Sequence, residues 1–197
     1  LVSSIENRGD AILILDVAGY GSNLLPVTTN ASSYNTSYAS TYWPWVKTVE
    51  PNLGTQIWTP ASTMIPSVYA FNDRVAEPWF APAGQTRGLL PTVIRAERNL
   101  TQGNRDTLYD NKVNSIATFP NTGVVVFGQK TLQRRRSALD RVNVRRLLIE
   151  LKDFISQVAD TLVFEQNNVN TRNTFLSQVN PYLADVQNRQ GLTDYRV

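Results

Sequence analysis

The sequence predicts an α/β (α+β) fold in which a mixed, incomplete sheet packs with a few amphipathic helices to form parts of two adjacent domains. Residues 11–17 and 123–128 are short apolar runs with glycines beside them, as in strands that are buried on both faces. Residues 142–164 repeat their apolar side chains every three or four positions, as an amphipathic helix does. No run of about eighteen apolar residues occurs, so no membrane insertion is expected.

In the first half of the chain, residues 19–30 are predicted to form a loop, and residues 31–40 a short polar helix. Residues 42–49 are aromatic and β-branched, which predicts a strand that Pro44 would place at a sheet edge or a bulge. Residues 55–58 are expected to return as its hairpin partner. Thr59 and Pro60 then begin a predicted helix of roughly fifteen residues.

The second half of the chain begins after residues 78–84, the richest proline and glycine segment, where we predict a domain boundary. Beyond it the sequence predicts an extended segment at residues 88–95 and a short helix at residues 102–111. After the long helix, Asn170 is expected to cap another helix, which Pro181 would kink or restart. Gly191 is expected to end that helix.

The composition excludes much of the usual catalytic chemistry. The chain has no cysteine and no histidine, so disulfides, thiol nucleophiles, histidine acid–base pairs and the usual zinc sites are ruled out. No stretch matches a phosphate-binding loop or a dinucleotide fingerprint. We therefore expect no enzyme activity, no catalytic residues, no cofactor and no metal site.

Arginines are concentrated in the stretch RRRSALDRVNVRR, where six of the fifteen lie within thirteen positions, namely Arg134, Arg135, Arg136, Arg141, Arg145 and Arg146. Cations at a helix N-terminus are unfavourable, so an anionic partner is expected nearby, with a solvated charged face as the alternative. The net charge is only +3 and lysines are few, which favours a specific protein partner over nucleic acid. Asp140 is expected to pair with Arg141 or another arginine.

Two other functions remain open from the residues alone. A basic nucleic-acid-binding domain could combine the arginines with an aromatic stacking platform, although the same aromatic side chains could belong to a core. The platform would consist of Tyr38, Tyr42, Trp43 and Trp45, with Lys47 beside them. A carboxylate hydrolase could use acidic pairs one helical turn apart, which a solvated helix face explains equally well; they are Asp106 with Asp110 and Glu150 with Asp153.

Six strings occur in order along the chain: YWPWVK, WFAPAGQTRG, RDTLYDNKVNSI, GVVVFGQKTL, ALDRVNVRRLLIELK and LVFEQNN. Together they resemble the C-terminal half of a contractile tail sheath protein of the kind found in large myophages. The resemblance covers nearly the whole chain, from residue 11 to residue 197. The absent starting methionine and the strand-like residues 194–197 likewise indicate a piece of a longer protein.

The resemblance implies a structural subunit that stacks in sixfold rings around an inner tube and contracts to drive the tube through the host envelope. Its partners would be other copies of itself, the inner tail tube protein, and the baseplate and tail terminator proteins. Residues 1–84 would belong to a middle α/β domain and residues 85–197 to the tube-proximal domain, without its terminal arm. The protein would lie in the virion after assembly in the host cytoplasm. The piece alone is expected to be monomeric or weakly associated, and the arginine cluster would contact the tube or a neighbour.

Overall fold

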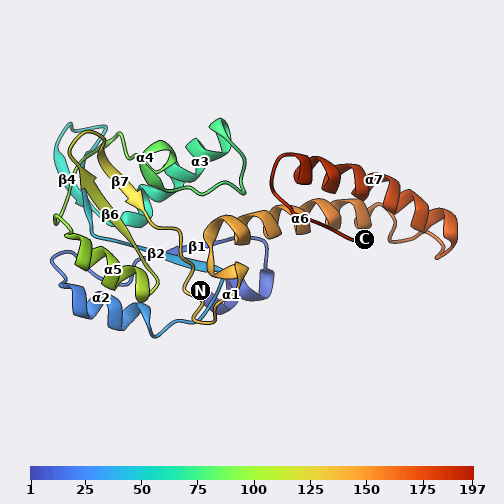
Figure 1. Ribbon diagram of the computed structural model, residues 1–197, viewed down its shortest axis with the longest axis horizontal. Coiled ribbons are helices and arrows are strands. Elements are labelled where there is room, and N and C mark those ends of the chain that lie inside the picture. Colours follow the sequence, from blue (N-terminus) through green and yellow to red (C-terminus); the bar gives the residue numbers. More distant parts are fainter. The chain divides into compact units, whose positions relative to one another are not determined.

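The computed structural model describes all 197 residues, which divide into two compact units, Leu1–Arg146 and Leu147–Val197. The first unit contains every strand, and the second is entirely helical apart from its loops and C-terminal segment (Figure 1). The fold class predicted from the sequence is confirmed: a mixed sheet and an antiparallel sheet, both unclosed, pack with amphipathic helices. None of the helices is long and apolar enough to cross a membrane.

A four-stranded sheet lies at the centre of the first unit, in the order β1 (Leu13–Leu15), β2 (Ala39–Trp43), β6 (Val113–Phe119), β7 (Gly123–Phe127). The first three strands are parallel, and β7 returns antiparallel to β6 through a tight turn. The strand predicted within residues 11–17 is confirmed, but its expected length and its burial on both faces are wrong. Strand β1 has only three residues, all half-buried, because it lies at the edge of the sheet.

A second, antiparallel sheet has the order β4 (Gln56–Thr59), β3 (Val46–Val49), β5 (Val93–Ala96). The predicted hairpin between β3 and β4 is confirmed, with Lys47 opposite Trp58. The single strand predicted for residues 42–49 is wrong, since β2 and β3 belong to different sheets. The chain crosses between them at Pro44, which cannot donate a ladder hydrogen bond and follows a cis peptide bond.

One face of the four-stranded sheet is covered by α2 (Leu24–Ala31) and α5 (Gln102–Asp110), which lie side by side in Figure 1. Helix α2 occupies residues predicted to be a loop, and the polar helix predicted at residues 31–40 is wrong, because that segment enters strand β2. The buried core on this face consists of small and branched side chains with one tryptophan: Val27, Ala31, Ala39, Trp43, Leu108, Val113 and Leu132.

The opposite face packs against α3 (Ile65–Val75) and the antiparallel sheet, with α4 (Gly84–Arg87) beside α3. The helix predicted from Thr59 begins later, because a 3₁₀ turn at Ala61–Thr63 precedes α3. This second core joins both sheets, and its largest members are Tyr42, Val46, Ile65, Val68, Tyr69, Leu90, Val93, Ile116, Val124, Val126 and Val142.

The structure is not divided at residue 84, where the sequence predicts a boundary. Strand β6 pairs with β2, and β5 pairs with β3, so strands from both sides of that residue share each sheet. The proline and glycine segment is instead a connection within the first unit. The compact units divide between Arg146 and Leu147, inside helix α6 (Val142–Asp160).

The second unit consists of most of α6 together with α7 (Val169–Asn188). Phe154 and Tyr182 stack with ring centroids 3.8 Å apart, and buried aliphatic side chains are spaced along both helices, among them Leu151, Val158, Val179, Leu183 and Val186. The N-cap of α7 is Asn168 rather than the expected Asn170, and its Oδ1 accepts from the backbone N–H of Thr171. Pro181 lies within the continuous helix, and Arg189 rather than Gly191 is its C-cap. A short helix, α1 (Val2–Arg8), begins the chain.

Candidate functional site

The structure separates the six clustered arginines into two groups. Arg134, Arg135 and Arg136 are exposed on a loop that precedes α6. Arg145 is buried, and Arg141 and Arg146 are half-buried. The prediction treated the six as one group, but only the first three are exposed rather than buried or half-buried.

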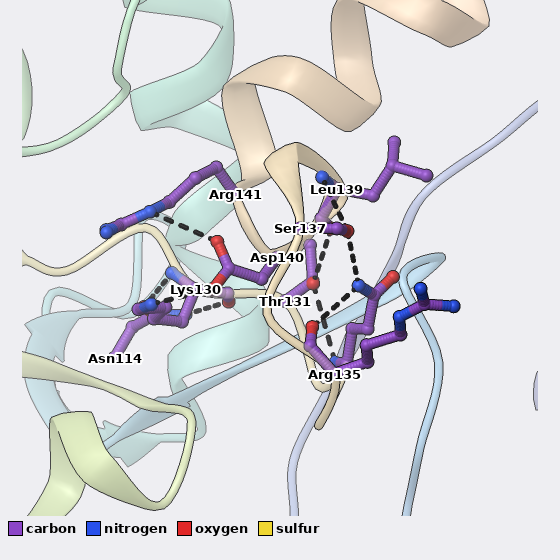
Figure 2. Close-up of polar contacts among 9 residues, drawn as sticks. Asn114, Lys130, Thr131, Arg135, Ser137, Leu139, Asp140 and Arg141 are labelled. Atoms are coloured by element: carbon purple, nitrogen blue, oxygen red, sulfur yellow. Dashed lines mark hydrogen bonds and ion pairs between the residues drawn. The ribbon is translucent and has the colours of Figure 1, made fainter.

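The arginine loop, residues 130–141, is closed at its base by paired backbone groups. Lys130 and Arg141 form an antiparallel bridge, and the Thr131 N–H donates to the carbonyl of Asp140 at 3.0 Å. The Thr131 hydroxyl donates to the carbonyl of Leu139 at 2.9 Å (Figure 2). These bonds hold the two ends of the loop together, so its exposed middle has a defined position.

Side chains within the loop fix its middle. The Gln133 amide nitrogen donates to the carbonyl of Arg135 at 2.8 Å and to the hydroxyl of Ser137 at 2.6 Å. The backbone N–H of Arg134 donates to Oδ1 of Asn35, from the segment that leads into β2. The three exposed guanidinium groups therefore extend from an ordered backbone, which lowers the entropy lost when a partner binds.

A buried ion pair supports the base of the loop. Lys130 Nζ lies 3.0 Å from Asp140 Oδ2, and both side chains are at most one-tenth exposed. Asp140 Oδ1 also lies 3.2 Å from Arg141 Nε, so the predicted pairing of these two residues is confirmed (Figure 2). Asn114, from the interior of β6, adds hydrogen bonds to the backbone N–H and carbonyl of Lys130.

Tyr109 lies beside these cations, with Lys130 Nζ 4.8 Å and Arg141 Cζ 5.8 Å from its ring centroid. Its partial burial alone would raise its pKa, but the hydrogen bond and charge of Arg141 and the charge of Lys130 together lower the pKa below its ordinary value. The base of the loop is thus an electropositive environment with a single carboxylate, that of Asp140.

Within the first unit, Arg145 and Arg146 join the first turn of α6 to other segments of the chain. Arg146 pairs with Asp73 of α3, and its guanidinium lies 4.7 Å from the ring centroid of Tyr69. Arg145 donates to the hydroxyl of Ser37 and lies 3.9 Å from the ring centroid of Tyr38. These contacts explain why cations occur at a helix N-terminus, where the macrodipole disfavours them.

The aromatic platform required for nucleic-acid stacking is not assembled. Tyr42 and Trp43 are 3% exposed and belong to opposite cores, and the Trp45 indole donates to the carbonyl of Ala18. The interpretation of these side chains as core residues is therefore the one that the structure supports.

The acidic pairs also lack the burial that a carboxylate acid–base site requires, because all four carboxylates are exposed: Asp106, Asp110, Glu150 and Asp153. No three carboxylates gather at a place where they could hold a metal ion.

No family model matches the chain, but individual proteins do. It is 32% identical to the tail sheath protein of Vibrio phage KVP40 over 99% of its length, which corresponds to 30% of that protein. It is 35% identical to the tail sheath protein of Enterobacteria phage T4 over 71% of its length, or 21% of that protein. The chain belongs to the tail sheath protein family. It spans less than a third of the length of these curated relatives.

Solved structures share the fold of the chain at lower sequence identity. A chain of the anti-feeding prophage baseplate superposes with a TM-score of 0.80 at 23% identity, covering 98% of this chain and 49% of that one. The contracted sheath complex of an extracellular contractile injection system, PVC, gives 0.78 at 24% identity, covering 93% and 50%. Both units therefore adopt a fold that also occurs in contractile injection systems.

Proposed function

We propose that the chain is part of a structural subunit of a contractile tail sheath. In this role it polymerises as stacked sixfold rings around an inner tube, and contraction of the rings drives the tube through the host envelope. The observation that carries the proposal is the match along 99% of the chain to a phage tail sheath protein. A structural role also fits a chain in which the arginines at the start of α6 and the two apolar cores contribute to packing.

The partners that follow from this role are other copies of the chain, an inner tail tube protein, and baseplate and tail terminator proteins. The superposed structures come from a baseplate and from a sheath complex, which supports other copies of the chain and baseplate proteins as partners. The protein would reside in the virion tail after assembly in the host cytoplasm.

The contact surface that we assign to this role is the exposed part of the arginine loop, Arg134, Arg135 and Arg136. Its three guanidinium groups extend from a backbone fixed by Gln133 and Asn35. Guanidinium groups favour bidentate pairing with carboxylates, so an acidic surface of the tube or of an adjacent subunit is the partner that fits.

Charge reversal tests the proposal in the full-length sheath protein that contains this chain. The variant is the triple substitution Arg134→Glu, Arg135→Glu, Arg136→Glu. Its sleeves are counted by negative-stain electron microscopy, and its contraction is scored from sleeve length. We expect the triple variant to form few sleeves, or sleeves that do not contract, whereas Arg74→Glu, on the exposed side of α3, should behave as the unaltered protein. Normal assembly and contraction of the triple variant would show that the loop is only solvated. A full-length protein that forms no sleeves under any condition would refute the sheath role itself.

A further inference from the structure

Arg145 is a buried cation without a carboxylate partner. Only 8% of the residue is exposed, and its Nε has no hydrogen-bond acceptor. Its contacts are the neutral Ser37 hydroxyl and the ring of Tyr38. Burial lowers its pKa, although the charge interaction with Tyr38 opposes that shift. Arginines are rarely this buried unless they are paired, because an isolated charge loses its hydration when it is buried.

The neighbouring cations differ from Arg145 in this respect. Lys130 and Arg141 share the carboxylate of Asp140, and Arg146 pairs with Asp73. Arg145 is thus the one cation at the start of α6 whose counter-charge is not supplied by the chain.

A hollow of about 360 Å³ lies beside the two residues that Arg145 contacts, although Arg145 itself does not line it. Ser37 and Tyr38, the two residues that Arg145 contacts, form part of its lining, and Arg135 of the arginine loop lies at its edge. The other lining residues are Asn35, Thr36 and Gln133, with Glu6 as the single acid. The Asn35 amide and the Thr36 hydroxyl can donate hydrogen bonds to an anion, whereas the Gln133 amide nitrogen already donates within the loop.

We propose that this hollow is an oxyanion-binding site, and that its occupant in the assembled protein is a carboxylate side chain from a second copy of this chain. Ser37, Asn35 and Thr36 donate to the carboxylate, Arg135 pairs with it directly, and Arg145 adds positive charge through the lining residues Ser37 and Tyr38. The site deepens the proposed function, since it rests on copies of the chain packing against each other.

The charges of the two units indicate where the carboxylate comes from. Residues 1–146 carry fifteen basic and ten acidic side chains, whereas residues 147–197 carry four basic and six acidic ones. The formal charges are therefore +5 and −2, and the helical unit of one copy is complementary to the strand-containing unit of another. Several carboxylates of the helical unit are exposed, including Glu150, Asp153 and Asp160.

The site is tested by nuclear magnetic resonance on the ¹⁵N-labelled chain, titrated with sodium acetate against sodium chloride at equal ionic strength. The signals followed are the Nε–H of Arg145, assigned by its loss in Arg145→Lys, and the backbone amides of Ser37, Tyr38 and Arg135. We expect these signals to shift to saturation with acetate and not with chloride. Arg135→Gln should weaken acetate binding about tenfold, the effect of losing one charge-assisted hydrogen bond. Arg74→Gln, elsewhere on the first unit, should leave binding unchanged.

The occupant is tested by a dilution series of the same sample. A second copy predicts that concentrating the chain shifts the same signals, and that saturating acetate abolishes the concentration dependence. Acetate binding without any concentration dependence would overturn the assignment to a second copy. Binding of inorganic phosphate but not acetate would overturn the carboxylate. If neither acetate nor phosphate shifts these signals, the site itself is refuted, while sleeve formation by the full-length protein is unaffected by that result.

Discussion

Replacing Asp140 by asparagine removes the carboxylate that two cations share at the base of the arginine loop. The Lys130 ammonium is then left buried, with its side chain only 7% exposed, and its remaining neighbour is the ring of Tyr109 at 4.8 Å. Removing one partner of a buried ion pair costs about 3–5 kcal/mol, because the other charge stays desolvated and unpaired. The half-exposed pair with Arg141 adds less than about 1 kcal/mol. We therefore expect Asp140→Asn to lower the free energy of unfolding by about 3–5 kcal/mol.

Urea denaturation followed by tryptophan fluorescence measures this loss. All four tryptophans lie in residues 1–146, so the signal reports on the unit that contains the ion pair. Asp10→Asn is the matched control, since Asp10 pairs with Arg8 at the surface of the same unit, where solvent screens the pair, and this substitution should leave the urea midpoint nearly unchanged. The double variant Lys130→Met, Asp140→Leu should recover most of the stability, because it leaves no buried unpaired charge and the Arg141 side chain that loses its partner is 38% exposed. A loss below about 1 kcal/mol for Asp140→Asn would refute the reasoning that burial makes this pair strong.

Three further predictions concern the cores and the helical unit. Burial raises the pKa of Tyr42 above its ordinary value of 10.0. The stability that its neutral form contributes is therefore complete below pH 10 and is lost as the pH rises beyond it. Tyr42→Phe should make the urea midpoint fall less steeply between about pH 9 and 11. Gly88→Ala should cost about 1–3 kcal/mol in the same assay, because its Cβ would lie 2.5 Å from the carbonyl oxygen of Val126, whereas Gly103→Ala in α5 meets no atom and should not destabilise the chain. Leu183→Ala in α7 should lower the free energy of unfolding of the helical unit by about 2–5 kcal/mol, because Leu183 is buried. Thermal melting monitored by far-ultraviolet circular dichroism measures this loss, and an unchanged melting curve would contradict the placement of Leu183 in a core.

The elements that the sequence predicted well are those whose pattern is local. The apolar period of α6, the hairpin of β3 and β4, and the apolar strand β7 each follow from neighbouring residues. Strand β6 was missed because its polar residues Asn114 and Ser115 are buried, and their hydrogen bonds go to Thr41, Lys130 and Phe127, far along the chain. Such partners cannot be read from a local pattern.

The candidate site shows the same limit. Its position before the long helix was predictable from the run of arginines. The separation into exposed and internal arginines was not, because it depends on Asp73, Ser37 and Tyr38, which are more than seventy positions away from their partners. A run of arginines indicates that positive charge is concentrated in that segment. Only the tertiary contacts determine which of those charges face solvent.

The crossover at Pro44 and Trp45 has a mechanical consequence. Only these two residues separate the last residue of β2 from the first residue of β3, so the two sheets are linked by the shortest of tethers. Tension applied to either sheet is transmitted to the other through this short connection, which can extend very little. The shared core around Tyr42 and Val46 resists sliding of one sheet against the other. The strand-containing unit should therefore carry load as a single stiff block, and deformation under tension should begin in the loops rather than between the sheets.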